Sequence, residues 1–498
     1  MTIETMSGAP VELSATPAPA VPARGPGTRT GSSPAGGADQ PVPTADGRQP
    51  ALASAIVRTL AHALPRSTGL TLAMDGGPSH PGQAGASGGA AGDPADDVPR
   101  RARVRIHGPG ALARMLPPTE NAFADALLRG DIDIDGDIAS AIDAAREIDL
   151  RRLSASELRR VLRWSLELRR AHRDDGVAPL RRPAARLAGA RHSRARDLEA
   201  IRFHYDVGEA FYRLWLDRRL TYSCAYFERD DDPVRDLDAA QEAKLDLVCR
   251  KLDLRPGQRL LDIGCGWGSL ILHAAERYKV DAVGVTLSGR QAGEANRRAE
   301  LMGLEHRVRA EVRDYRDLAE LGPFDAVASI GMFEHVGAAN LPRYFGVALE
   351  ALAPGGRFLN HGIAAAGRGR SAWPRAATWR GGLRRATFTE RYVFPDGELV
   401  PVERAVEAAR DIAGFEVLDL QSLRPHYALT LQAWVARLEA AWDEAVSAAG
   451  EEVARTWRLY MAGARVGFER GDLDVAQLLL ARPAVGGRPA ARPLRPWW

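Results

Sequence analysis

Cysteine is scarce in this chain of 498 residues, which has three cysteines and no C-x-x-C pair. Cys224, Cys249 and Cys265 therefore form no disulfide framework of the kind that supports small secreted domains, and we expect a reducing cytoplasm. Long apolar runs are also missing, since no uninterrupted run approaches the ~18 residues that a bilayer-spanning helix requires. The first residues lack the basic and apolar segments of a signal peptide, so any contact with a membrane is predicted to be peripheral.

An excess of charge of one sign is likewise absent, because 67 basic residues stand against 64 acidic ones and give a formal net charge of +3. This balance is too mild for a dedicated nucleic-acid-binding protein, and nucleic acid is excluded as a partner. The acidic turn at residues 130–138 is similar to a calcium loop with Gly136 at its sixth position, but the twelfth position is Ile142 instead of a carboxylate. No metal site is predicted there.

Composition divides the chain into five parts. Residues 1–50 are rich in Pro, Ala and Gly and almost free of aromatic residues, which predicts a disordered tail. Residues 51–150 show helical and strand-like patterns that predict a small α+β domain, with a flexible insertion at about 76–98. Residues 151–194 are predicted to be a largely helical, arginine-dense connector, whose basic face is either solvated or directed towards a membrane. Residues 195–482 form the main domain, and residues 483–498 a basic flexible tail.

The main domain is organised around residues 258–291, whose pattern predicts a strand, a glycine turn, a helix and a second strand. Gly264, Gly266 and Gly268 follow the first apolar run at alternate positions, just after Asp262. Glycine permits a tight turn and a close approach of ligand to backbone, and the free N–H groups of the next helix suit a polar ligand. The spacing G-x-G-x-G differs from the dinucleotide fingerprint G-x-G-x-x-G. The sequence LDIGCGWG instead resembles motif I of S-adenosylmethionine (SAM) methyltransferases.

Strand-like runs recur at residues 308–312, 324–330 and 357–359, with helical stretches between them. This alternation predicts an α/β fold with a doubly wound, mostly parallel sheet and ligands at the carboxyl ends of its strands. The expected architecture is a Rossmann-like class I SAM methyltransferase with a smaller amino-terminal α+β domain. Two helices are expected at residues 429–449 and 451–466.

Seven motifs indicate which family of SAM methyltransferases the chain resembles. They are HYD (204–206), TYSCAYF (221–227), GCGWG (264–268), TLSGRQ (286–291), FEHVG (333–337), H-x-I (361–363) and YVFPDGEL (392–399). In this order they resemble the cyclopropane-fatty-acyl-phospholipid synthase family, which includes the mycolic acid cyclopropane synthases and the 10-methylene and 10-methyl fatty acyl methyltransferases. The resemblance covers residues 195–480 well. Residues 51–150 are a weaker match to the amino-terminal lipid-binding domain of the bacterial synthases.

The resemblance implies transfer of the SAM methyl group to the cis double bond of a phospholipid acyl chain, followed by bicarbonate-assisted deprotonation to a cyclopropane. It also implies a peripheral position on the inner face of the cell membrane and is compatible with a homodimer. One alternative is the same transfer ending in a 10-methylene chain that a separate reductase reduces. Two others are methylation of a soluble small molecule and a lipid carrier without enzymatic activity.

The resemblance also implies site residues, carried over one position at a time. Around bicarbonate, Glu334 accepts the hydroxyl, His361 donates a ring N–H, Tyr427 donates its hydroxyl, and Cys224 and Ile363 contribute backbone groups. The cofactor residues are Tyr222 and Ser223 at the methionine end, Asp262, Gly264 and Gly266 in the glycine turn, Thr286, Leu287, Ser288 and Gln291 at the ribose, and Asp314 and Tyr315 beside the adenine. Ala464 stands where many members have cysteine, so a thiol nucleophile is impossible there.

Two segments combine arginine with tryptophan, a composition that suits an anionic membrane surface. The first, residues 368–385, contains Arg368, Arg370, Trp373, Arg375, Trp379, Arg380, Arg384 and Arg385. The second is the carboxyl-terminal tail, with Arg488, Arg492, Arg495, Trp497 and Trp498. We expect residues 368–385 to dock on lipid; the alternative is that they form an ordinary flexible loop. The tail has a similar composition, which supports the same role less strongly.

Overall fold

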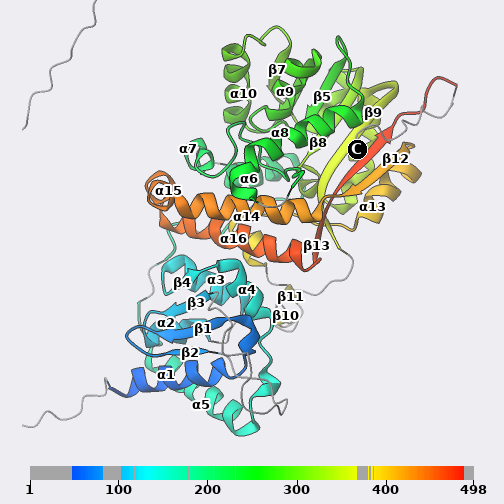
Figure 1. Cartoon of the computed structure of the whole chain (residues 1–498). Helices are drawn as coiled ribbons and strands as arrows, with labels where there is room; N and C mark the ends of the chain where they lie inside the picture. Colours follow the sequence, from blue (N-terminus) through cyan, green and yellow to red (C-terminus); the bar gives the residue numbers. More distant parts are fainter. Residues whose placement is uncertain are drawn as a thin grey trace, which may run out of the picture. The chain divides into compact units, whose positions relative to one another are not determined.

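The computed structural model describes residues 47–81, 102–116, 119–176, 179–182, 184–205, 207–229, 232–366, 379–380, 383–384 and 386–486. Two larger sheets organise this part of the chain (Figure 1). One has four strands in the order β2-β1-β3-β4, and the other has seven in the order β12-β13-β9-β8-β5-β6-β7. The predicted α/β fold with a smaller amino-terminal α+β region is therefore confirmed.

The amino-terminal sheet combines parallel and antiparallel pairs. Its strands are β1 (Leu70–Met74), β2 (Ser79–Pro81), β3 (Ala102–Ile106) and β4 (Ile132–Gly136), and only β1 and β3 pair in parallel. Its helices are α1 (Arg48–Ala61), α2 (Pro109–Met115), α3 (Glu120–Arg129), α4 (Ile138–Arg146) and α5 (Ala155–Ala171). The side chains of Thr119 and Asp137 cap the first turns of α3 and α4. These caps explain why two short helices begin where they do.

The main sheet has a parallel centre and an antiparallel edge. Its parallel strands are β5 (Arg259–Ile263), β6 (Asp281–Thr286), β7 (Val308–Val312), β8 (Phe324–Ile330) and β9 (Leu352–Ala365). The strands β13 (Leu473–Ala481) and β12 (Glu416–Ser422) add antiparallel pairs beyond β9. The predicted runs 308–312 and 324–330 coincide with β7 and β8. By contrast, β9 is much longer than the predicted run 357–359.

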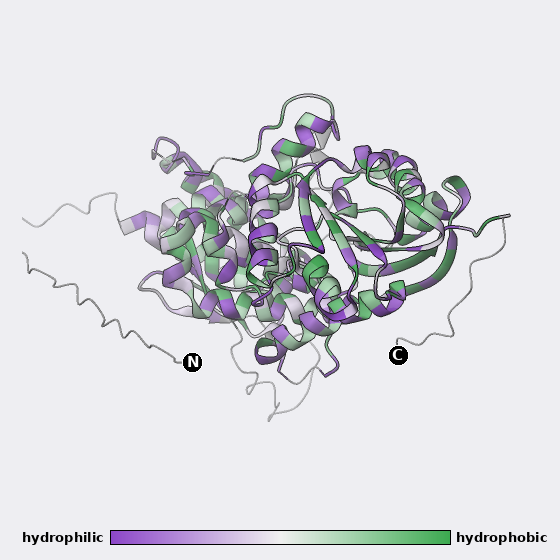
Figure 2. Ribbon diagram, turned by 90° about the horizontal axis from the view of Figure 1, so that it is seen from above, coloured by the Kyte–Doolittle hydropathy of each residue, from purple (hydrophilic) through white to green (hydrophobic). Residues whose placement is uncertain are grey.

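Helices cover both faces of the main sheet. Leu260 of β5 packs in a core with α8 (Pro233–Leu252), α9 (Ser269–Tyr278) and α10 (Gly289–Leu301). The next residue, Leu261, packs in a second core with α11 (Leu341–Ala351) and α13 (Val402–Glu407). Successive strand residues point to opposite faces, so this division confirms the doubly wound arrangement. Figure 2 shows hydrophilic and hydrophobic residues mixed along the outer helices, as one buried face per helix requires.

A third core joins the remaining helices to the amino-terminal sheet. These helices are α6 (Arg194–Tyr205), α7 (Glu209–Arg213), α12 (Phe388–Tyr392), α14 (Arg424–Ala440), α15 (Trp442–Ala449) and α16 (Glu451–Glu469). Trp215, Trp434 and Trp457 are buried at its centre. Arg391 of α12 pairs with Asp125 of α3 at 3.2 Å. The two helices expected at residues 429–449 and 451–466 are three in the structure, because α14 ends at Ala440.

Four further expectations about local structure differ from the structure. Helix α1 begins at Arg48, inside the expected tail 1–50, whose first 46 residues lie outside the described residues. Residues 79–81 of the expected insertion pair with β1 as strand β2. The expected acidic turn is strand β4, because Ile132 and Ile134 are buried and the intervening aspartate is not. In the expected helical connector, the described residues after α5 and before α6 form no helix.

The structure describes only part of the segments that were expected to dock on lipid. In residues 368–385 the structure describes a short antiparallel pair, β10 (Trp379–Arg380) with β11 (Leu383–Arg384). The remaining members of that segment, and the tail residues Arg488, Arg492, Arg495, Trp497 and Trp498, lie outside the described residues. Among the residues described, no helix combines the length and apolarity needed to cross a bilayer.

A substitution at Gly284 of β6 tests how closely the glycine turn packs on the sheet. An added Cβ at this position would lie 2.6 Å from Cβ of Cys265 and 2.9 Å from Cδ1 of Ile271. We therefore expect Gly284→Ala to lower the free energy of unfolding by about 1–3 kcal/mol, measured by urea denaturation. The control is Gly293→Ala in α10, where a Cβ meets no atom within 4 Å and helix propensity favours alanine. Equal urea midpoints for Gly284→Ala and the unaltered chain would contradict this packing.

Candidate active site

The glycine turn follows β5 and begins the site at the carboxyl end of the sheet. Gly264 and Gly266 have φ angles of +85° and +52°, a region that only glycine adopts at little cost. A Cβ on Gly264 would lie 3.0 Å from Cβ of Met332, whereas one on Gly266 would meet no protein atom within 4 Å. At Gly268 a Cβ would lie 2.8 Å from Cβ of Ala295 in α10. Gly266 therefore leaves room at the turn, whereas Gly264 and Gly268 permit close packing of Met332 and of α10.

A cavity of about 120 Å³ lies against this turn. Nine of the predicted cofactor residues line it: Tyr222, Ser223, Asp262, Gly264, Gly266, Thr286, Leu287, Gln291 and Tyr315. Two do not. Ser288 caps α10 by accepting a hydrogen bond from the N–H of Gln291 at 3.3 Å, and the carboxylate of Asp314 accepts hydrogen bonds from Arg316 at 2.7 Å. Both side chains support the cavity wall instead of facing the cavity.

The hydroxyl of Thr286 shows how this cavity can bind a sugar without an acidic residue. It donates a hydrogen bond to Oε1 of Gln291 at 2.8 Å and accepts one from the N–H of Ser288 at 3.2 Å. The amide NH₂ of Gln291 therefore remains available as a donor in the wall of the cavity. A neutral amide is thus held where many nucleotide-binding units place a carboxylate.

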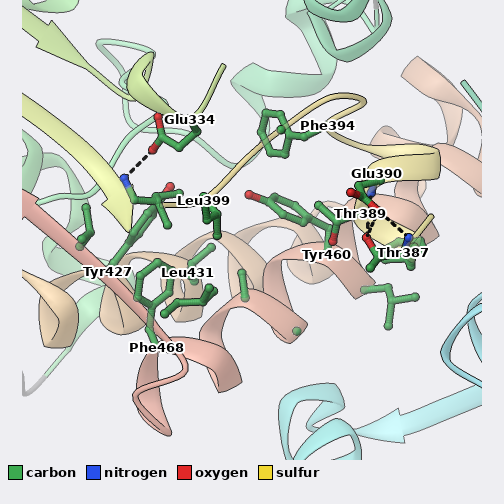
Figure 3. A pocket seen from close by; sticks show the side chains of 18 of the residues that line it. Glu334, Thr387, Thr389, Glu390, Phe394, Leu399, Tyr427, Leu431, Tyr460 and Phe468 are labelled. Carbon is green, nitrogen blue, oxygen red and sulfur yellow. Dashed lines mark hydrogen bonds between the residues drawn. The ribbon is translucent and has the colours of Figure 1, made fainter. Parts of the chain in front are cut away.

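A second cavity, of about 550 Å³, is larger and mostly apolar. Its lining includes all five predicted catalytic residues, Glu334, His361, Tyr427, Cys224 and Ile363. It also includes Phe123 of α3 and Ile142 of α4, so the amino-terminal region forms part of the wall. Figure 3 shows Glu334 and Tyr427 towards one end and Thr387 with Glu390 at the other, with Leu399 and Tyr460 between them.

The two cavities share part of their walls. Tyr205, Tyr222, Ser223, Gly331 and His335 line both. A group bound against the glycine turn can therefore reach the end of the larger cavity that holds Glu334.

Glu334 is held by the short 3₁₀ helix η6 (Phe333–His335), which follows β8. Its Oε1 accepts a hydrogen bond from the N–H of Ile363 at 2.6 Å. Its Oε2 is buried without a partner among the described residues. Burial raises the pKa of this carboxyl to about 7, and the bond from Ile363 opposes that rise. Glu334 is therefore a fixed acceptor that changes charge near neutral pH.

His361 and Tyr427 supply donors at the same end of the cavity. Burial lowers the pKa of His361 well below its ordinary value, so the ring is neutral. Nε2 of Gln477 lies 3.2 Å from Nδ1 of His361; with this amide donating, the imidazole proton is on Nε2, which is buried and has no partner among the described residues. Burial also raises the pKa of the Tyr427 phenol, which keeps its O–H.

The remaining two predicted catalytic residues behave differently. Ile363 was expected to contribute a backbone group, and its N–H donates a hydrogen bond to Glu334. The thiol of Cys224 is buried, donates to the carbonyl of Ala225 at 3.2 Å, and has a raised pKa because of that burial. Ala464 lines the cavity beside Gly463. No thiolate nucleophile is therefore formed by these positions.

The lining of the cofactor cavity also includes residues that were not predicted to bind the cofactor, among them Lys244, Trp267, Arg313, Tyr205 and His335. Tyr205 and His335 lie inside the motifs HYD and FEHVG, so these motifs could have indicated that both residues belong to the site. Lys244 comes from α8, outside every motif, and only the folding of α8 against the sheet brings it to the cavity.

The fold and the glycine turn define a SAM-dependent methyltransferase. Residues 192–478 match the family model described as mycolic acid cyclopropane synthetase, and the chain belongs to this family. A probable fatty acid methyltransferase of Pseudomonas putida is 38% identical over 389 residues, 77% of this chain and 88% of that protein. A probable fatty acid methyltransferase of Mycobacterium tuberculosis is 39% identical over 402 residues, 78% and 88% of the two chains. These findings confirm the predicted family.

Solved structures agree with this assignment. Mycolic acid cyclopropane synthase CmaA1, complexed with SAH and CTAB, is 36% identical with a TM-score of 0.52, and the match covers 57% of this chain and 98% of that one.

Glu334→Gln separates the charge of this residue from its hydrogen bond. The amide oxygen still accepts from Ile363 but never ionises. A carboxyl whose folded pKa of about 7 exceeds its ordinary 4.5 contributes stability that is complete below the lower value and is lost as pH rises through the upper one. We expect equal urea midpoints at pH 4.5, and a variant more stable than the unaltered chain by up to about 3 kcal/mol at alkaline pH. A midpoint difference that is independent of pH would contradict this account.

Proposed function

We propose that this enzyme transfers the SAM methyl group to the cis double bond of an unsaturated phospholipid acyl chain and then removes a proton to close a cyclopropane. The observation that carries the proposal is the junction of the two cavities. An apolar cavity of about 550 Å³ suits an alkyl chain better than a polar metabolite. Glu334, His361 and Tyr427 supply polar groups to its lining, and Glu334 and Tyr427 lie at the end opposite Thr387 and Glu390 (Figure 3).

The residues of the cofactor cavity fit SAM, which supplies an electrophilic methyl group when bound. Gly264 and Gly266 give a close approach to the backbone, and Gln291 offers its amide to the ribose hydroxyls. Tyr222 and Ser223 belong to both cavities. They therefore position the donor end of the cofactor against the acyl chain and keep water from the junction.

The catalytic end also fits bicarbonate, which supplies a proton acceptor when bound. Oε2 of Glu334 is the acceptor for its hydroxyl, while Nε2–H of His361 and the hydroxyl of Tyr427 are donors for its oxygens. Two of these atoms are buried without a partner among the described residues, as a site for a small hydrogen-bonding anion requires. The bond from Ile363 fixes the carboxylate of Glu334 so that its second oxygen points to the ligand.

A methylene-branched chain, later reduced by a separate enzyme, is the second candidate product. It shares the methyl transfer and differs only in which carbon loses the proton. The two relatives that match beyond the family model are named as probable fatty acid methyltransferases, without reference to a ring. Methylation of a soluble small molecule is disfavoured, because α3 and α4 extend the apolar wall far beyond what a small acceptor needs.

The product is decided by mass spectrometry of lipids from a host that expresses the chain. We expect acyl chains heavier by one methylene unit that resist hydrogenation, because a cyclopropane has no alkene. The same mass gain with a reducible double bond would replace the first product by the second. Unchanged lipids, with a methylated soluble metabolite, would overturn the acyl substrate.

Turnover is expected to depend on the charge of Glu334. We expect turnover to rise with pH through about 7, the pKa of this carboxyl, because only the ionised form accepts the proton of bicarbonate. Glu334→Gln is expected to lower turnover by at least about 100-fold while SAM binding, measured by calorimetry, remains. Full activity of the variant would remove Glu334 from the mechanism.

Helix α5 supports peripheral docking on an anionic membrane. Leu158, Leu162 and Leu166 are spaced by one helical turn and expose 36%, 57% and 54% of their surface. Arg159, Arg163, Arg169 and Arg170 are exposed on the same helix. The two acids lie elsewhere: Glu157 closes the capping box, and Glu167 pairs with Arg48. An exposed face with only leucine and arginine suits an anionic lipid surface.

Docking through α5 is tested by co-sedimentation with vesicles. We expect the double variant Leu162→Gln and Leu166→Gln to lose most binding to phosphatidylcholine vesicles that contain phosphatidylglycerol. Leu301→Gln is the matched control, because Leu301 is 74% exposed on α10. Equal binding of both variants would exclude α5, and loss of a dimer in place of vesicle binding would assign this face to a second copy of the chain.

A further inference from the structure

Lysine is rare in this chain, and its placement is unusual. Of the 67 basic residues only Lys244, Lys251 and Lys279 are lysines. Lys244 and Lys251 are buried, with 1% and 0% of their surface exposed. Burying an ammonium group costs free energy unless an anion lies close to it. We therefore expect an anionic partner close to each of these two lysines.

Lys251 has that partner within the protein. Its Nζ lies 3.4 Å from Oδ2 of Asp419 and donates to Oε1 of Gln421 at 2.6 Å. Both partners belong to β12 at the edge of the sheet, and Lys251 does not line either cavity. Contacts within the protein therefore explain why Lys251 is buried, and no ligand is needed.

Lys244 is different, because its hydrogen-bond partner is neutral. Its Nζ donates to Oγ of Ser223 at 2.9 Å. Asp217 and Asp262 act on it only over a longer distance, and no carboxylate of the described residues forms an ion pair with it. Burial consequently lowers the pKa of Lys244 to about 8. Yet this ammonium lines the cofactor cavity, where a ligand can supply the missing negative charge.

The position of Lys244 indicates which part of the cofactor it meets. Ser223, its partner, lines both cavities and so lies at the end where the methyl group leaves. Gln291 and Tyr315 line only the cofactor cavity, beyond β6 and β7. The amino-acid part of SAM, which extends from the sulfonium away from the adenosine, therefore lies towards Ser223 and Lys244.

A second buried group faces the same cavity with the opposite charge. Asp262 is the penultimate residue of β5 and lines the cavity, and its Oδ1 is buried without a partner among the described residues. An ammonium donor and a carboxylate acceptor in one small cavity complement a zwitterion such as an α-amino acid.

We propose that Lys244 binds the carboxylate of the methionine part of SAM, directly and through the hydroxyl of Ser223. The inference deepens the proposed function by assigning the residue that supplies the charge for the cofactor's amino-acid end. The ammonium of Lys244 is a compact charge on a narrow stem and can donate to the ligand as well as to Ser223.

Calorimetry with SAM and decarboxylated SAM tests the proposal, since the two ligands differ only in the carboxylate. We expect the unaltered chain to prefer SAM by about 10- to 100-fold, the range for a hydrogen bond to a charged group. Lys244→Met should bind both ligands equally, by losing affinity for SAM alone. Lys251→Met is the control and should keep the preference of the unaltered chain.

Three results would overturn the proposal. They are retention of the SAM preference in Lys244→Met, an equal loss of affinity for both ligands, and equal binding of both ligands by the unaltered chain. The last result needs no variant, so it decides the matter even where Lys244→Met does not fold. Because no acyl substrate is present, the outcome is independent of whether the product is a cyclopropane.

Discussion

Burial of ionisable side chains at the junction of two cavities is the constraint on which the candidate site depends. The larger cavity is lined mostly by apolar side chains, and the residues that it shares with the cofactor cavity are buried or half-buried. In such surroundings the charged form of any group is disfavoured. Burial is accordingly the largest cause of the raised pKa values of Glu334 and Asp262 and of the lowered values of His361 and Lys244. One physical effect thus sets the charges of the whole site.

This burial lowers the stability of the folded chain, but it also holds polar atoms where a ligand can bind them. Buried atoms of Glu334, His361 and Asp262 have no partner among the described residues, and each such atom costs stability. The rest of the fold offsets that cost through three hydrophobic cores and a seven-stranded sheet. In the proposed mechanism, the same atoms are the acceptor and donors of the ligand, and the protein holds them in place before the ligand binds, as electrostatic preorganisation requires.

The antiparallel edge of the sheet also contributes to the site. Gln477 of β13 pairs in register with His361 of β9 and contacts its ring. The neutral tautomer that donates from Nε2 therefore depends on a strand that is far away in sequence. The amino-terminal region contributes in the same way, since Phe123 and Ile142 extend the wall of the larger cavity. A main domain alone would leave that wall open.

The sequence by itself determined the class of fold, the glycine turn and most of the residues at the site. Strands β7 and β8 were predicted to the residue, because the alternation of β7 at the sheet edge and the mostly apolar run of β8 are both local patterns. Glu334 and His361 were proposed because they lie in motifs whose order is specific, and Tyr427 was carried over from the same family resemblance. Only the tertiary structure decided that Ile363 donates to Glu334, that Asp314 binds Arg316, and that Lys244 faces the cofactor cavity. These are contacts between side chains or strands whose partners are chosen by packing, and no local pattern records which of several nearby groups packing will bring together.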